Sequence, residues 1–227
     1  ACNYNPDATE DDGSCEFSCY YSWFVDINGS ESGDGSSFYP FNTIQMAIDA
    51  ASYGDTVMVA PGTYHENIII DKPLKIFSYF VTLNDSIYID DTILDGSWST
   101  PNSAEQSVIF FNYSTDGRSF NESQLSGFTI QGGTGTKITE RCNGEYVDKY
   151  VGAAIFMINN NPTINANIIK DNGKNGDEGI DIVSEGPVCN IKDDDVEFRS
   201  GDNRDASLFT YDACNEEVDG TLEHRIL

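Results

Sequence analysis

The first residues of the chain carry a regular series of oxygen-bearing side chains that could bind a cation. They occupy every second position, at Asn3, Asn5, Asp7, Thr9 and Asp11, and Asp12 and Gly13 follow them. Calcium prefers oxygen ligands, and calcium loops present them around a turn glycine in a similar way. We therefore predict calcium ligands at Asn3, Asn5, Asp7, Asp11 and Asp12. The downstream Glu of an EF-hand is missing at its required offset, so an Asx-rich turn tied by a disulfide stays open as the alternative.

The chain has six cysteines, Cys2, Cys15, Cys19, Cys142, Cys189 and Cys214. Their number is even, none form C-x-x-C pairs, and the chain has 2 histidines, which favours disulfides over a zinc site. Of the many connectivities, we predict Cys2–Cys15 and Cys189–Cys214. Disulfides persist in oxidising compartments, so a secreted or cell-surface location is expected. N-x-S triplets at Asn28, Asn84, Asn112 and Asn121 give weak support.

Other residues offer catalytic or binding chemistry, each with a simpler structural explanation. His65 and Glu66 adjoin and could transfer a proton. The carboxylates Asp90, Asp91 and Asp95, and the run 193–195, are explained more simply by turn chemistry and solvation. Trp98 follows Asp95 and Gly96 and could stack on a sugar ring, so it is the predicted glycan contact.

The net charge of the chain limits the classes of molecule that we expect it to bind. The chain has 12 Lys and Arg against 38 Asp and Glu, a formal net charge of -26. Such a chain repels phosphate backbones and anionic lipids, so nucleic acid is not an expected partner. No apolar run is long enough to cross a membrane, so no membrane insertion is expected. The first residues have neither the basic nor the apolar region of a signal peptide, so we expect a mature or excised piece of a larger protein with further domains.

The pattern of hydrophobic residues predicts a β-solenoid. Residues 42–52 have helical periodicity, with Asn42 or Thr43 as N-cap. Short strands are expected at 56–60, 67–70, 74–80, 86–94, 108–112, 125–131, 153–159 and 163–169. Strands without helices between them exclude a βαβ fold, and irregular turns disfavour a sandwich. Rows such as Val57, Ile68 and Ile76 would stack inward between coils, and the helix would cover the open first coil.

Residues 34–70, DGSSFYPFNTIQMAIDAASYGDTVMVAPGTYHENIII, closely resemble the opening of secreted pectin-lyase-like right-handed parallel β-helix domains. TILDGSW (92–98), LSGFTIQGG (125–133) and NNNPTINANIIKDN (159–172) resemble later coils of that family. The resemblance covers about residues 25–185 and implies an all-β, right-handed parallel β-helix. It also makes Glu66 part of the fold motif, and a structural role is favoured there. Ala153 and Ala154 replace glycines common in the family, which should not alter the fold.

Residues 1–19 resemble the Asp- and Cys-rich repeats, of the form ACNYNPDAT-x-DDGSC, of large proteins exported by the type IX secretion system. We expect a disulfide-linked acidic module at 1–19, a β-helix at 20–185 with its helix cap at 42–52, and an acidic cap or extension at 186–227. The expected function is a non-catalytic extracellular or cell-surface module that serves as a rigid stalk or binds a polysaccharide or cell-surface glycan. Because related folds carry polysaccharide lyases and hydrolases, a calcium-dependent enzyme of that kind is the alternative.

Overall fold

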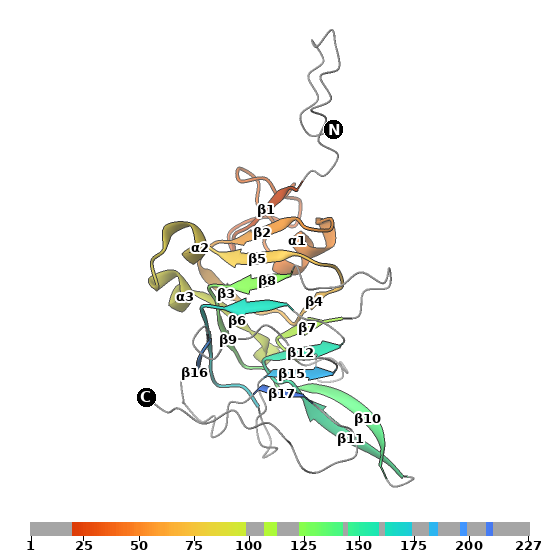
Figure 1. Ribbon diagram of the computed structural model, residues 1–227. Helices are drawn as coiled ribbons and strands as arrows, with labels where there is room; N and C mark the ends of the chain where they lie inside the picture. Colours follow the sequence, from red (N-terminus) through yellow and green to blue (C-terminus); the bar gives the residue numbers. More distant parts are fainter. Residues whose placement is uncertain are drawn as a thin grey trace, which may run out of the picture.

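The structure is a computed structural model that describes residues 20–98, 107–112, 123–142, 145–158, 162–173, 182–185, 196–198 and 208–210. Its strands form three parallel sheets and one two-stranded ribbon (Figure 1). The first sheet contains β1 (Ser22–Val25), β2 (Thr56–Val59), β5 (Lys75–Ser78), β8 (Gln124–Ser126) and β13 (Thr163–Asn165). The second contains β3 (Gly62–Tyr64), β6 (Thr92–Asp95), β9 (Thr129–Gln131), β14 (Asn167–Ile169) and β16 (Val196–Phe198). The third contains β4 (Ile68–Ile70), β7 (Ile109–Phe111), β12 (Ile155–Ile158), β15 (Ile182–Glu185) and β17 (Leu208–Thr210).

The chain visits the three sheets in a fixed order, so each round of the chain is one coil of a parallel β-helix. The first full coil runs through β2, β3 and β4, and the second through β5, β6 and β7. Strands of successive coils pair in parallel, with Val57 opposite Ile76 and Tyr64 opposite Leu94. The predicted β-strand content and the parallel stacking are therefore confirmed. β16 and β17 pair in parallel with β14 and β15, so strands also stack beyond residue 185.

The core is a set of aliphatic rows that run through the coils. Val57, Ile76, Leu125 and Ile164 are in register on the first sheet, and all four are fully buried or nearly so. Every second residue of a strand points to the same face, so one inward row per sheet forms without any long-range sequence repeat. Burial of each such side chain contributes about 1.5–3 kcal/mol, and neighbouring coils share that contribution.

Two segments predicted as single strands are divided by a corner. Residues 125–131 become β8 and β9, with Gly127 at φ 93 between them. Residues 163–169 become β13 and β14, with Ala166 at φ 50. The buried amide of Asn167 supports the corner, because it donates to the Leu125 and Asn165 carbonyls and accepts from the Phe128 N–H. These side-chain bonds replace the ladder bonds that a corner interrupts.

The segment predicted as a strand at 86–94 contains a helix and a strand. α2 (Phe80–Leu83) and α3 (Ile87–Asp91) precede β6. Asn84 adopts the left-handed conformation between them, and the Ile87 N–H donates to the Asp85 carboxylate. A short apolar run does not distinguish strand from helix, and these local turn bonds favour the helix. Both short helices form a projection between the first and second sheets (Figure 1).

An antiparallel ribbon interrupts the third coil. β10 (Thr136–Cys142) and β11 (Glu145–Val151) lie between β9 and β12 in the chain and pair with each other. The ribbon extends away from the stacked strands (Figure 1). It was not predicted from the sequence. None of the helices in the described part of the chain is long and apolar enough to cross a membrane.

Candidate functional site

Helix α1 (Ile44–Ala50) lies on the first coils of the solenoid, where the sequence predicts a cap. Thr43 is its N-cap residue, and its hydroxyl accepts the Met46 N–H at 3.3 Å. Ile44, Ala47 and Ile48 are buried in the same core cluster as the aliphatic rows. The helix predicted at 42–52 is therefore present with one of its two proposed N-caps, and its apolar side covers the core.

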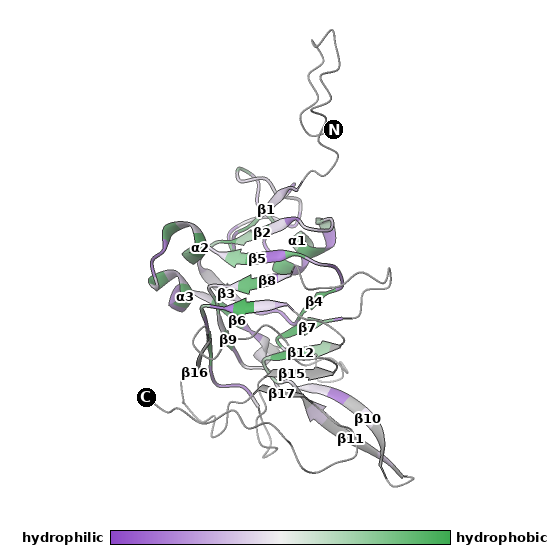
Figure 2. Ribbon diagram, viewed as in Figure 1, coloured by the Kyte–Doolittle hydropathy of each residue, from purple (hydrophilic) through white to green (hydrophobic). Residues whose placement is uncertain are grey.

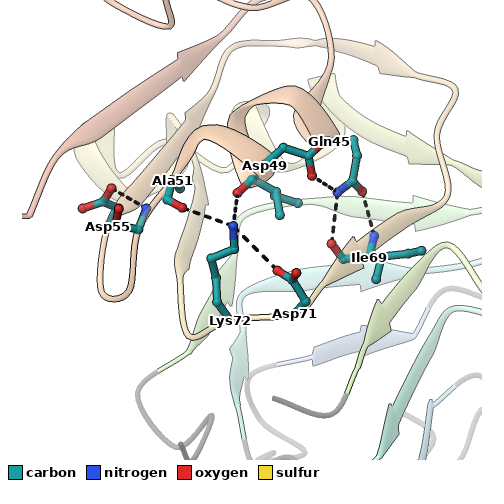
Figure 3. Close-up of polar contacts among 9 residues, drawn as sticks. Gln45, Asp49, Ala51, Asp55, Ile69, Asp71 and Lys72 are labelled. Carbon is teal, nitrogen blue, oxygen red and sulfur yellow. Dashed lines mark hydrogen bonds and ion pairs between the residues drawn. The ribbon is translucent and has the colours of Figure 1, made fainter. Parts of the chain in front are cut away.

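Charged side chains of the first coil hold both ends of α1. The Glu66 carboxylate accepts the Ile44 and Gln45 N–H groups at 2.8 and 3.0 Å. The Lys72 ammonium donates to the Ile48 and Ala51 carbonyls at 3.0 and 3.2 Å (Figure 3). A negative charge at the N-terminus and a positive charge at the C-terminus each stabilise a helix. Burial raises the pKa of Glu66, and the two backbone N–H donors oppose that rise.

Gln45 closes the exposed edge of the third sheet. Its side-chain oxygen accepts the Ile69 N–H at 2.8 Å, and its amide donates to the Ile69 carbonyl at 3.2 Å and to Asp49 at 2.8 Å (Figure 3). β4 is the first strand of that sheet, so these are the backbone groups that a preceding coil would pair with. The side chain thus imitates a neighbouring strand at an edge that would otherwise invite pairing with another chain.

Asp55 organises the start of the first sheet. This carboxylate is completely buried and accepts the Tyr21 N–H, the Trp23 indole N–H and the Ser52 N–H at 2.7, 2.9 and 2.8 Å. Trp23 stacks on Phe41 with ring centroids 6.1 Å apart. Asp55, Glu66, Gln45 and Lys72 therefore have structural tasks at the closed end of the solenoid, which agrees with the structural role expected for Glu66.

The outer surface of the second sheet carries a series of polar residues that we call the polar row. It consists of His65, Asp95, Gln131 and Lys170. Asp95 is opposite Gln131 in the register. His65 follows Tyr64, which is opposite Leu94, and Lys170 donates its N–H to the Ile130 carbonyl. The four residues therefore follow one another across four coils, at the strand spacing of about 4.8 Å.

Asp95 contacts two other members of the polar row, His65 and Gln131. Its carboxylate accepts the Ser97 N–H at 2.9 Å and the Gln131 amide at 3.1 Å, and the His65 Nδ1 lies 3.9 Å from it. Burial alone would raise the pKa of Asp95, but hydrogen bonds from Ser97 and Gln131 and the nearby His65 hold the pKa below its ordinary value. Gly132 adopts φ 75 beside this carboxylate, and a Cβ there would collide with it. The carboxylate is thus charged and fixed next to a half-exposed imidazole.

Several predicted site residues lie outside the described residues. These are the proposed calcium ligands Asn3, Asn5, Asp7, Asp11 and Asp12 and the proposed disulfide partners Cys2, Cys15, Cys189 and Cys214. The backbone of Trp98 ends a short 3-10 helix, Gly96–Trp98, next to Asp95, and its side chain is outside the described part. Across the described residues, no three His, Cys, Asp or Glu side chains gather to hold a metal ion.

In the structure His65 lies beside Asp95, whereas the Glu66 carboxylate accepts hydrogen bonds from the N-terminus of α1. Sequence reasoning considered the adjacent pair His65 and Glu66, and it did not find the polar row. Neighbouring residues of an extended segment point to opposite faces, so adjacency is a poor guide to partnership in a β-helix. One signal in the sequence could have revealed the row. Each of its four residues directly follows a buried residue that faces inward, an aliphatic one for Asp95, Gln131 and Lys170 and Tyr64 for His65.

Comparisons with known proteins agree with this architecture. A protein of Bacillus subtilis (strain 168) named "Uncharacterized protein YwoF" is 31% identical over 85 residues, which cover 34% of this chain and 18% of that protein. The chain thus matches less than a fifth of that relative's length. The family described as "Protein of unknown function (DUF1565)" matches residues 27–199, which is most of the β-helix. The chain therefore belongs to the DUF1565 family, whose members are right-handed β-helix proteins with the pectin-lyase-like fold.

Proposed function

We propose that the chain is a non-catalytic extracellular or cell-surface module whose β-helix is a rigid platform for a polysaccharide or cell-surface glycan. The polar row is the observation that carries this proposal. It presents an imidazole, a carboxylate and an amide side by side on paired strands, and Lys170 follows at the next position in the register. Such fixed donors and acceptors suit the hydroxyl and carboxylate groups of a sugar polymer, because little order is lost on binding.

The closed end of the solenoid also supports a platform. Asp55 and Glu66, two of the acidic residues of the opening motif, each accept two or more N–H groups of their own chain. A carboxylate committed to backbone donors holds the fold together and is poorly placed to exchange protons with a ligand. The resemblance of residues 1–19 to type IX secretion cargo supports an exported parent protein with further domains. Calcium binding by residues 1–19 is part of the same proposal.

The experiment is a titration of the purified chain with acidic and neutral polysaccharides by isothermal titration calorimetry. Gln131→Ala and Lys170→Ala should each weaken binding about 3- to 10-fold, the equivalent of one lost hydrogen bond. Lys75→Ala is the matched control, because Lys75 lies on the first sheet. If Lys75→Ala loses binding while Gln131→Ala and Lys170→Ala keep it, the binding site is not the polar row, and the proposal is contradicted.

A calcium-dependent polysaccharide lyase or hydrolase is the second candidate. The observation in its favour is the His65 Nδ1 located 3.9 Å from the Asp95 carboxylate. A fixed carboxylate can orient an imidazole and stabilise its protonated form, as in a general-base pair. An enzyme would shorten the polymer, whereas a platform would leave it intact.

A further inference from the structure

The projection between β5 and β6 exposes large aliphatic side chains. We call residues 79–91, which contain α2 and α3, the knob. Val81, Leu83 and Ile87 are 43%, 55% and 53% exposed in it. Figure 2 shows hydrophobic residues on both helices. Exposed aliphatic residues concentrated in one short element are typical of an interaction site.

The knob is an ordered element. The rings of Tyr79 and Tyr88 pack with centroids 6.3 Å apart, and the Thr82 hydroxyl donates to the Tyr79 carbonyl at 3.0 Å. On its other side α3 packs on the second sheet, where the Thr129 hydroxyl donates to the Ile89 carbonyl at 2.8 Å. The backbone that carries the exposed side chains is therefore held in place before any partner binds, which reduces the entropy lost on binding.

Acidic residues lie around these side chains and limit the chemistry of a surface that could bind the knob. Asp85, Asp90 and Asp91 are exposed in the same segment. A surface that covers the knob must therefore combine apolar or aromatic groups with positive charge, and an anionic lipid surface or a nucleic acid does not.

The β10–β11 ribbon, which we call the arm, has this chemistry. Tyr146 and Tyr150 are 75% and 50% exposed, and Lys137, which is also exposed, lies opposite Tyr150 in the register. The arm contains three basic and three acidic residues and so has no net charge, in a chain of net charge -26. Among the described strands, β10 and β11 pair only with each other. Two strands alone are marginally stable, so a surface to dock on would benefit the arm.

The positions of arm and knob require two copies of the chain. In Figure 1 the knob projects from the left flank of the solenoid and the arm from its lower right, so the arm of one chain points away from its own knob. Each strand of the arm has 7 residues, which gives the arm a reach of about 23 Å. That reach exceeds the screening length of about 8 Å at physiological salt. Two acidic solenoids held apart by an arm would therefore repel each other only weakly.

We propose that copies of this chain associate with the arm of one copy docked on the knob of the next, Tyr146 and Tyr150 on Leu83 and Ile87, and Lys137 near Asp85. The contact is heterologous, because it uses two different surfaces of the same chain. Repeated contacts of that kind produce open chains or closed rings instead of a symmetric dimer. This assembly is independent of any glycan bound at the polar row.

The test is sedimentation velocity of the purified chain over a range of concentrations at physiological ionic strength. The knob variant is Leu83→Ser with Ile87→Ser, and the arm variant is Tyr146→Ser with Tyr150→Ser. Neither changes the net charge, and thermal melting confirms that each still folds. The wild type should form a series of oligomers, whereas each variant alone should sediment as a monomer. A mixture of both variants should form a dimer and nothing larger, because one intact arm meets one intact knob.

Three results would overturn the proposal: a wild type that stays monomeric at every concentration, a variant that still dimerises alone, or a mixture that stays monomeric. The second result would indicate a symmetric arm–arm or knob–knob contact. Phe38→Ser with Tyr39→Ser, at positions 87% and 69% exposed, is the control for general stickiness and should leave assembly unchanged. Asp85→Lys and Lys137→Asp should each weaken assembly about 2- to 5-fold, and the two together should restore it.

Discussion

Adjacent residues of this chain perform unrelated tasks because the strand geometry separates them. His65 lies beside Asp95 on the outer surface, while Glu66 holds the N-terminus of α1. The two carboxylates, Glu66 and Asp95, have pKa values shifted in opposite directions. The pKa of Glu66 is raised by burial, and the pKa of Asp95 is lowered by the hydrogen bonds and imidazole around it.

These opposite shifts predict opposite pH dependences of stability. A raised pKa means that folded Glu66 binds its proton more tightly than the unfolded chain, so its contribution to the free energy of unfolding falls as pH rises from 4.5, its ordinary value, through the folded pKa. Asp95 contributes stability above 3.8, its ordinary value, and loses it as pH falls through its folded pKa.

Urea unfolding of the wild type, Glu66→Gln and Asp95→Asn from about pH 3 to about pH 8 measures both contributions. Relative to the wild type, Glu66→Gln should become progressively more stable with rising pH and Asp95→Asn progressively less stable. Wild-type and variant profiles that run parallel would show that neither carboxylate titrates as described.

Gln45 gives the sharpest residue-scale test of the closed end. Gln45→Ala removes two hydrogen bonds to Ile69 and leaves a strand edge unpaired, so the free energy of unfolding should fall by about 1–3 kcal/mol. Hydrogen exchange should show the Ile69 amide protected in the wild type and exchanging quickly in the variant. Gln124→Ala, on the interior strand β8, is the matched control and should leave that amide protected. Equal Ile69 protection in wild type and Gln45→Ala would contradict the edge closure.

At the scale of elements, the corners between strands determine how the coils close. Gly127 and Ala166 occupy the same corner in successive coils, since the Gly127 N–H donates to the Ala166 carbonyl at 3.1 Å. Both have positive φ, which favours glycine. At Gly127 an added Cβ would also collide with the Ser78 hydroxyl and approach Phe80.

Gly127→Ala should therefore lower the free energy of unfolding by about 2 kcal/mol or more, since strain and collision add. Ala166→Gly should raise it by up to about 1 kcal/mol, because glycine relieves the strain of the left-handed conformation. Urea unfolding of both variants checks the pair. Equal destabilisation by both changes would indicate that the two corners are not equivalent.

The sequence predicted the elements whose pattern is local. The inward residues Val57 and Ile76 lie in short runs of strand-forming residues, and the helix near Ile44 has helical spacing and an N-cap, so both were predicted correctly. Helix α3 of the knob was wrongly predicted as part of a strand at 86–94. The short apolar run at 87–89 fits either structure, and the turn bond to Asp85 together with packing on the second sheet favours the helix. The polar row depends on register between residues some 30 to 40 positions apart, which one sequence does not show.

On the scale of the whole molecule, one core runs through the stacked coils, and α1 contributes Ile44, Ala47 and Ile48 to it. Each coil packs only against its neighbouring coils, so the first coil has a neighbour on one side only and benefits from the packing of α1. The solenoid can then present the polar row and the knob as fixed surfaces, and the arm extends from it.

Calcium should stabilise the acidic module at residues 1–19 if Asn3, Asn5, Asp7, Asp11 and Asp12 are ligands. Bound calcium favours the folded module by mass action, about 2.7 kcal/mol when calcium exceeds its Kd 100-fold. Calcium should thus raise the melting temperature of the module, and a chelator should lower it. A chain that begins at Tyr20 serves as control and should not respond. If neither calcium nor the chelator changes the melting temperature of the full chain, the calcium proposal is contradicted.

The central claim is that this β-helix binds a sugar polymer and does not cut it. The most direct test incubates the chain with acidic and neutral polysaccharides, with calcium present, and measures both the bound polymer and new unsaturated or reducing ends. The platform predicts a bound polymer of unchanged length and no new ends in either the wild type or His65→Ala. New ends that form with the wild type and disappear in His65→Ala would contradict the claim and identify the His65 and Asp95 pair as catalytic.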